Sequence, residues 1–474
     1  MSSSNPSVRL TALEKITLVH VAVLLLGSSW AFGGNIGWAR LALSLWGSLA
    51  MPITAFALLN KGSLAPGVSR RQAWWLLPAA LYAVLVLASA FNPSFQAFTS
   101  EGQTFLVHRG AAHPHWPNTV NPDASLRALW FGAGAFLSAF NLSLVLRNRT
   151  VLRRLLVFIA ANTLILSVYG SLQKLSSSGY YFGASVSPNK RYFSTFIYNN
   201  HWGAFMILVL SVSVGLLFYH LRRSHGRDLW HSPFTGALLG VLIIAATAPI
   251  SASRAATGMA VVLIAIAVTH AIMRILIVRR RQVRSIWPPL ALLTVFVLAV
   301  TCAVGWLGLK SINERYTETR VALEKNQSLW SSRAELYGDT WQLAAQKPVF
   351  GWGLDSYGTA FQLIRPRSIQ LHRQYESSYD TAHSDWLQSL AETGFVGTAL
   401  LLLTFALPLA TLPRAQLGHP LVAYPLGGLG LVLLYAWIEF PFSSAAVVIA
   451  FWTVFFTTLR FAQLTDLASH LRHE

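Results

Sequence analysis

The sequence predicts an all-α, polytopic membrane protein, and three observations support this prediction. First, 54% of the 474 residues are hydrophobic and 11% are charged, whereas a soluble domain has about 25% charged residues. Second, apolar runs of about 20 residues recur along the chain, which is the length that an α-helix needs to cross a bilayer. Third, the 17 tryptophans and 14 tyrosines suit the two membrane interfaces, where aromatic rings gather.

Twelve apolar runs are predicted as membrane-spanning helices. The first follows Arg9 and Lys15 and is expected to remain as an uncleaved helix, because no small-residue cleavage site follows it. The others are separated by polar segments, most of which are short. In chain order the twelve predicted spans are 16–33, 38–59, 73–91, 124–146, 155–173, 199–221, 234–250, 256–278, 287–308, 393–412, 420–440 and 443–461.

The distribution of lysine and arginine orients these helices. With the amino terminus in the cytoplasm, 20 of the 36 Lys and Arg residues fall in cytoplasmic segments, against seven in the short segments of the other side. The remaining nine lie in one long loop, which the positive-inside rule does not count. Both termini are therefore predicted to be cytoplasmic. The net charge of +19 is attributed to this bias, and no nucleic-acid partner is expected.

A long polar segment separates the ninth and tenth predicted spans, and we call residues 309–392 the lid. Ten of the 17 acids lie between Lys310 and Glu392, together with nine bases. Helical patterns within it favour a folded, helical periplasmic loop over a disordered linker. The predicted organisation is therefore 1–308 with helices one to nine, 309–392 with the lid, and 393–474 with helices ten to twelve and a cytoplasmic carboxyl terminus.

The end of the lid carries a candidate general base. His383 stands between two acids, Asp380 and Asp385, just before an apolar run. Histidine accepts and returns a proton near neutral pH. If the segment is helical, Asp380 and His383 share one face, whereas Asp385 points elsewhere. The alternative is an interfacial helix whose polar side chains only meet water.

Two arginines on the outer side form a candidate phosphate clamp. Arg254 lies among small residues between two apolar runs, where a charge usually has a polar partner, although it can also extend to lipid headgroups. Arg191, beside Lys190, precedes the helix start at Asn200, and helix amino termini favour anions. The planar fork of arginine binds phosphate through two hydrogen bonds. The chain lacks an HExxH motif, and its single cysteine, Cys302, rules out a thiolate zinc cluster, so no metal is expected.

The layout and several short motifs resemble the O-antigen ligase and polymerase (Wzy_C) superfamily. The resemblance covers nearly the whole chain, including the large outer loop between spans nine and ten. It is carried by Arg333 to Trp341, by the turn Pro348-Val349-Phe350-Gly351-Trp352-Gly353, by His383-Ser384-Asp385-Trp386-Leu387-Gln388 and by Glu392-Thr393-Gly394-Phe395-Val396-Gly397. Ser384 stands where asparagine is common in the family.

This resemblance implies a GT-C-like fold and an inverting glycosyltransferase that needs neither metal nor cofactor. The implied donor is an O-antigen on undecaprenyl diphosphate, and the implied acceptor is lipid A–core, at the periplasmic side of the inner membrane of a Gram-negative bacterium. His383 matches the essential histidine, and Arg191 and Arg254 match the arginines that hold the diphosphate. Asp380, Asn200, Lys190 and Asp385 are possible supporting residues. The alternatives are an O-antigen polymerase, a protein O-oligosaccharyltransferase, or a transporter or flippase of a lipid-linked sugar.

Overall fold

A computed structural model describes most of the chain. The described residues are 9–68, 70–101, 103–176, 180–181, 185–186, 189, 191–223, 232–291, 293–295, 297–298, 305, 329–364 and 380–470. Within these ranges, ten segments are helical, long enough and apolar enough to cross a membrane, and the helix Pro420–Tyr435 is apolar but shorter. The protein is therefore a multi-pass helical membrane protein.

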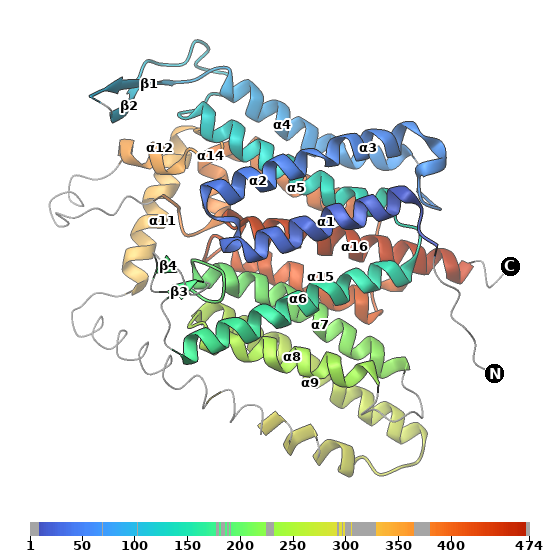
Figure 1. Cartoon of the computed structure of the whole chain (residues 1–474). Helices are drawn as coiled ribbons and strands as arrows, with labels where there is room; N and C mark the ends of the chain where they lie inside the picture. Colours follow the sequence, from blue (N-terminus) through green and yellow to red (C-terminus); the bar gives the residue numbers. More distant parts are fainter. Residues whose placement is uncertain are drawn as a thin grey trace.

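The long helices run in largely alternating directions along the chain (Figure 1). In the first half the helices and strands are α1 (Ala12–Trp30), η1 (Phe32–Gly34), α2 (Gly37–Ser48), α3 (Ala50–Leu59), η2 (Lys61–Ser63), η3 (Arg70–Trp75), α4 (Leu76–Ala90), β1 (Phe95–Ser100), β2 (Gln103–His108), α5 (Pro122–Val145), α6 (Arg149–Leu175), β3 (Tyr180–Tyr181) and β4 (Ser185–Val186). In the second half they are α7 (Asn199–Arg223), α8 (Pro233–Ile250), α9 (Arg254–Arg281), α11 (Leu329–Gln346), α12 (Tyr357–Ile364), α14 (Asp385–Leu409), η4 (Arg414–Gln416), α15 (Pro420–Tyr435), η5 (Pro441–Ser443) and α16 (Ala445–His470).

The long helices lie side by side and give the molecule two distinct ends (Figure 1). Helices α11 and α12 and the β1–β2 hairpin gather at one end, which we call the lid end. The start of α1 and the end of α16 lie at the other, which we call the terminal end. Helices α7 and α16 begin at the lid end, whereas α6 and α15 begin at the terminal end. The starts of α7 and α16 are thus placed close to the lid.

Two helices form the centre of the bundle. The apolar windows of α16 and α7 are 89% and 78% buried inside the protein, whereas that of α9 is 6% buried. The apolar side chains of α7 and α16 pack into one continuous core with those of α5, α6 and α15. The exposed apolar face of α9 suits contact with lipid chains, because an apolar side chain that faces lipid carries no hydrophobic cost.

The structure corrects several predicted boundaries. The predicted span 420–440 ends earlier, at Tyr435, so that residues 436–440 form a connection outside the helix. Half of the predicted span 287–308 lies outside the described residues, as do lid residues 309–328 and 365–379. The all-α prediction missed two short antiparallel pairs, β1–β2 and β3–β4. The β1–β2 hairpin lies in the loop before α5, where the apolar and polar residues of Phe95–Ser100 gave no long periodic signal.

The described part of the lid has its own small core. Trp352, Tyr357 and Phe361 are buried there with residues of α11 and with Ala391 of α14. The indole of Trp352 donates a hydrogen bond to the carbonyl of Leu343, 2.9 Å away, which joins the turn after α11 to that helix. Val120, on the segment before α5, donates its N–H to the carbonyl of Trp352 at 3.0 Å. These contacts fix the lid to the helix bundle.

A break in α14 allows residues 348–353 of the lid to form backbone hydrogen bonds with this helix. Gly394 has φ 63° and ψ −170°, a conformation that is open essentially to glycine alone. The break frees the N–H groups of Phe395 and Val396, which donate to the carbonyls of Pro348 and Val349 at 2.8 and 3.2 Å. It also frees the carbonyls of Ala391 and Glu392, which accept from the N–H groups of Trp352 and Gly353 at 2.9 and 2.8 Å. Residues 348–353 thereby satisfy the backbone groups that the broken helix exposes.

Candidate active site

Four elements meet at the lid end and bring His383 into a polar cluster. His383 lies directly before α14, and Arg333 and Tyr337 come from α11. Glu439 and Phe440 lie in the connection between α15 and η5. Tyr198 lies one residue before α7. The cluster therefore combines lid residues with residues at the ends of membrane-spanning helices.

His383 does not lie on a helix, which corrects the helical assumption for Asp380 and His383. Ser384 caps α14, since its hydroxyl accepts the N–H of Leu387, and His383 has a φ of 51°. Positive φ is uncommon for a residue with a side chain and is held only by surrounding contacts. Two such contacts are present. The hydroxyl of Tyr337 donates to the carbonyl of His383 at 3.0 Å, and the imidazole meets the edge of the Phe440 ring with centroids 4.8 Å apart.

Glu439 is the carboxylate that the structure places against the imidazole. Its Oε2 atom lies 3.7 Å from Nδ1 of His383, and its Oε1 atom accepts a hydrogen bond from Arg333 at 2.6 Å. The side chain of Glu439 is 4% exposed. Burial raises the pKa of Glu439, but the neighbouring His383 and Arg333 lower it by more, so the pKa lies below its ordinary value. Glu439 is therefore ionised at neutral pH.

The two ring nitrogens of His383 have different surroundings. Nδ1 is buried and has no hydrogen-bond partner among the described residues. The side chain as a whole is 29% exposed, so its accessible surface belongs to the other ring atoms, which include Nε2. A shift of less than 1 Å would bring Nδ1–H into hydrogen-bond range of Glu439, and catalytic hydrogen bonds are often long before substrate binds. With the proton on Nδ1, Nε2 is the basic atom that faces the open side.

The start of α7 forms the other wall of the cluster. The Tyr198 ring stacks on Phe440, with centroids 5.3 Å apart, and its hydroxyl lies 3.4 Å from Oε2 of Glu439. Asn200 donates through Nδ2 to the same hydroxyl at 2.8 Å. His201 meets the edge of Phe440 and bonds to Asn35 at 2.8 Å and to Ser443 at 3.1 Å.

A cavity of about 340 Å³ lies beside the start of α7. Its lining residues are Asn35, Ile36, Gly37, Arg40 and Ser443. His201 bonds to two of these lining residues and also touches Phe440, so it stands between this cavity and His383. The cluster therefore borders this cavity through His201.

Arg191 lies beside the start of α7, and Arg254 begins the adjoining helix α9. The carbonyl of Arg191 accepts the N–H of Asn199, the first residue of α7, and Arg254 is the first residue of α9. The two starts are tied together, because Asn199 Nδ2 donates to the Ser251 carbonyl at 2.8 Å. Helices α7 and α9 approach so closely that a Cβ on Gly203 would lie 2.6 Å from the Cβ of Ala256.

Arg191 also acts on the His383 cluster electrostatically. Burial and the charge of Glu439 raise the pKa of Tyr198, while Arg333 and Arg191 are among the groups that lower it. Arg191 is therefore close enough to Tyr198 to influence the proton of its hydroxyl. Both Arg191 and Arg254 are exposed residues.

The predicted supporting residues have different positions. The Asp380 carboxylate lies near Gly358 of α12, 3.2 Å from the Cβ position of that glycine. Asp385 is a positioning residue, because its carboxylate accepts the N–H of Phe442 at 2.9 Å and its own N–H bonds to the Ala436 carbonyl at 2.9 Å. It thereby holds the connection that carries Glu439. Lys190 lies outside the described residues.

The described residues do not bring three or more His, Cys, Asp or Glu side chains together as a metal would require. The metal independence that the sequence led us to expect stays a prediction.

Glu439 and Arg333 are functional candidates that the sequence interpretation did not select. A signal for Glu439 was present, since it is the only acid between Glu392 and Asp466 and stands between two apolar runs. An ionisable residue in such a place defaults to a functional hypothesis. Its partner was hidden, because α14 and α15 lie between His383 and Glu439 in the chain.

The fold and this cluster define a multi-pass membrane protein with a histidine–carboxylate pair at the mouth of a helix bundle. Residues 239–402 match the family model described as O-antigen ligase. This segment is a Wzy_C domain of the O-antigen ligase family, a family of glycosyltransferase-type membrane enzymes, which confirms the resemblance that the motifs predicted. The match contains Arg254, Arg333 and His383, whereas Arg191 and Glu439 lie outside it. No curated protein matches the chain.

Proposed function

We propose that the protein is an O-antigen ligase, an inverting glycosyltransferase that moves a glycan from undecaprenyl diphosphate to a sugar of lipid A–core. The observation that carries this proposal is the array of Arg333, Glu439 and His383, which presents one open imidazole nitrogen between the lid and the start of α7. Such an array of base and orienting acid serves to remove a proton from a hydroxyl group.

The reaction is a single displacement at the anomeric carbon of the donor. The acceptor hydroxyl oxygen forms a bond to that carbon, while the bond from the carbon to the diphosphate oxygen breaks. The hydroxyl proton passes to Nε2 of His383, and undecaprenyl diphosphate leaves with the bonding electron pair. Attack from the side opposite the leaving group inverts the anomeric centre. General-base help of this kind is worth about 10²–10⁴ in rate.

Glu439 prepares the histidine for this step. As an ionised carboxylate held by Arg333, it favours the proton on Nδ1 and stabilises the imidazolium that forms when Nε2 accepts the acceptor's proton. Because the carboxylate is almost fully buried, water screens this interaction little.

Arg191 and Arg254 are proposed to hold the donor diphosphate. Arg191 lies beside the start of α7 and Arg254 begins α9, one hydrogen bond ties these two helix starts together, and both residues are exposed. Arginine forks and helix amino termini both stabilise phosphate charge. The charge grows on the leaving diphosphate during the reaction, so that donors fixed beforehand lower the barrier by about 3–4 kcal/mol for each well-placed group.

The location of the reaction follows from the same orientation. The lid end is proposed to face the periplasm and the terminal end the cytoplasm, because lysine and arginine are concentrated in the segments at the terminal end. The undecaprenyl chain would lie along apolar helix faces, and lipid A–core would enter from the same leaflet.

The test is transfer of a glycan from purified undecaprenyl-diphosphate donor to purified lipid A–core by the detergent-solubilised protein in EDTA. We expect transfer by the wild type and a loss of at least about 10²-fold in His383→Ala, as for a lost general base. Asp380→Asn serves as the matched control at the other acid near the end of the lid, and we expect it to remain active.

The outcomes separate the proposal from its rivals. Chain extension without lipid A–core labelling would make the protein a polymerase, and labelling of serine or threonine in a peptide would make it a protein O-oligosaccharyltransferase. Movement of the donor across the membrane without any glycosidic bond would make it a transporter. Full transfer activity in His383→Ala would overturn the mechanism.

A further inference from the structure

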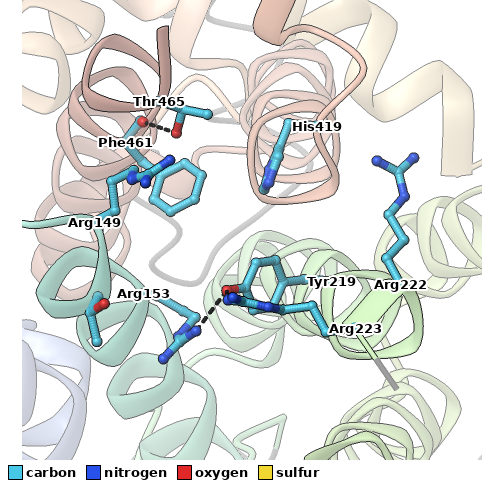
Figure 2. Close-up of a pocket in the computed structure, with 9 residues that line it drawn as sticks. Arg149, Arg153, Tyr219, Arg222, Arg223, His419, Phe461 and Thr465 are labelled. Atoms are coloured by element: carbon cyan, nitrogen blue, oxygen red, sulfur yellow. Dashed lines mark hydrogen bonds between the residues drawn. The ribbon is translucent and has the colours of Figure 1, made fainter. Parts of the chain in front are cut away.

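A second cavity lies at the terminal end, far from His383 along the helices. It has a volume of about 440 Å³, which is within the range of ligand-binding pockets. Three membrane-spanning helices and the residue before α15 contribute its walls (Figure 2). The lining residues are Arg149, Thr150 and Arg153 of α6, Tyr219, Arg222 and Arg223 of α7, His419, and Phe461 and Thr465 of α16.

The lining is strongly basic. Four of the nine lining residues are arginines and none is an acid, although Asp466 follows Thr465 on α16. Within the described part of the chain, none of these four arginines forms an ion pair with a carboxylate. Burial, followed by the charges of Arg222 and Arg149, lowers the pKa of His419 to about 4, so its imidazole is neutral and the positive charge is that of the guanidinium groups.

Two of the arginines converge on one neutral atom. Arg153 of α6 donates to the Tyr219 hydroxyl at 2.6 Å, and Arg223 of α7 donates to the same oxygen (Figure 2). Both guanidinium groups also lie against the Tyr219 ring, 5.3 and 5.4 Å from its centroid. Like charges held this close repel one another, and a phenol oxygen offsets little of that repulsion. An anion between the two helices would offset it.

Other lining groups complement an anion with an apolar part. Helix α6 begins at the cavity, so its amino-terminal partial positive charge adds to the arginines. Thr150 adds a hydroxyl group. The Phe461 ring forms an apolar section of the wall and packs against His419, with centroids 5.1 Å apart (Figure 2).

We infer that this cavity binds the phosphate headgroup of an anionic phospholipid from the leaflet at the terminal end. The site is formed near the ends of helices long and apolar enough to cross the membrane, and lipid headgroups lie at the ends of such helices. Basic pockets between membrane helices at the cytoplasmic side suit such headgroups, and arginine forks match phosphate oxygens. The lipid's glycerol and upper acyl carbons would lie against Phe461. This site is separate from the proposed donor site, which lies at the lid end.

The test is native mass spectrometry of the full-length protein in a neutral detergent, with equal amounts of phosphatidylglycerol and phosphatidylcholine that carry the same acyl chains. We expect the wild type to retain phosphatidylglycerol at least about tenfold more than phosphatidylcholine, which corresponds to about 1.4 kcal/mol. The double variant Arg149→Gln/Arg222→Gln should lower phosphatidylglycerol retention about tenfold. Since the measurement is of binding, it does not depend on whether the protein transfers a glycan.

The matched control is Arg280→Gln/Arg281→Gln, which removes the same charge from exposed residues at the end of α9. It should leave the phosphatidylglycerol signal within about twofold of the wild type, since neither of these arginines lines the cavity. If the first pair fails to fold, Arg149→Lys/Arg222→Lys keeps the charge and removes the forks, and should lower retention about threefold.

Three outcomes would overturn the inference. One is equal retention of the two lipids, and another is an equal loss in the cavity pair and the α9 pair. The third is displacement of the lipid by inorganic phosphate or glycerol 3-phosphate at equal concentration, which would make the ligand a soluble anion. Loss only in the cavity variants, with no displacement by these soluble anions, is the expected result.

Discussion

Nδ1 of His383 lies 3.7 Å from Oε2 of Glu439, although helices α14 and α15 separate the two residues in the chain. Helix α14 runs from the lid end to the terminal end, and α15 returns to the lid end (Figure 1). The start of α14 and the end of α15 therefore lie close together. Asp385 strengthens this meeting by holding the connection after α15 through two backbone hydrogen bonds. The pairing of His383 with Glu439, which we propose to act as base and orienting acid, is therefore a product of helix packing.

Glu439→Gln is predicted to reduce glycan transfer about 10²-fold, with a small change in KM. The amide keeps the size of the side chain but loses the charge that stabilises the imidazolium and holds Arg333. The measurement is single-turnover transfer from the lipid-linked donor. Asp380→Asn makes the same chemical change at the acid near α12 and should alter the rate by less than about threefold. A larger effect at Asp380 than at Glu439 would reverse the roles assigned to them.

Gly394→Ala is predicted to destabilise the protein by about 1–3 kcal/mol or more. A Cβ at this position would lie 2.3 Å from the carbonyl oxygen of Val349, and the backbone conformation is itself unfavourable for alanine. Thermal unfolding in detergent measures the effect. Gly427→Ala is the control, since that glycine is exposed on α15 with nothing near its Cβ position. The control should be neutral or stabilising by about 0.5–1 kcal/mol, and equal losses in both variants would contradict the role of the helix break.

Lys347 is predicted to make the stability of the protein increase with pH in the alkaline range. Burial lowers its pKa to about 8 in the folded protein, below the ordinary value of about 10.4. Folding therefore favours the neutral amine. Below pH 8 the buried charge lowers the free energy of unfolding by its full amount, and this loss of stability disappears as the pH rises from about 8 to 10.4. The wild type should gain stability relative to Lys347→Met over that range.

The measurement for Lys347 is the midpoint of thermal unfolding for both proteins from pH 7 to 10. The ammonium also lies 4.0 Å from the centroid of the Trp352 ring and donates to Asn118, so the two proteins are compared only by the slope of their difference with pH. A difference that does not change across this range would contradict the assigned pKa.

Arg460→Met is predicted to lower the stability of the terminal end. The Arg460 side chain is fully buried in α16 and donates to the carbonyls of Leu146 and Pro66, each at 2.9 Å. Methionine would leave both oxygens without these donors, at a cost of about 1–3 kcal/mol each. The midpoint of thermal unfolding should fall, whereas Arg414→Met, at an exposed position, should leave it almost unchanged. Similar midpoints for the two variants would argue against a structural role for Arg460.

The membrane class could be predicted from the sequence because it depends on local composition. A bilayer requires about 20 apolar residues for each crossing, so hydropathy alone locates the helices. His383 was also identified from its neighbours. The helix break at Gly394 was not identified, because its backbone is stabilised by residues 348–353, which lie far away in the sequence.

The sequence by itself thus determined a multi-pass helical membrane protein with a Wzy_C segment at residues 239–402, and it offered His383 as a candidate base. The tertiary structure decided which acid faces that histidine, and it placed Glu439 there with Arg333. It also joined the start of α7, beside which Arg191 lies, to the start of α9 at Arg254, and it gathered four arginines into one cavity at the terminal end. The physical reason is that hydropathy depends on each segment alone, whereas the pairing of charges depends on which helix ends pack together.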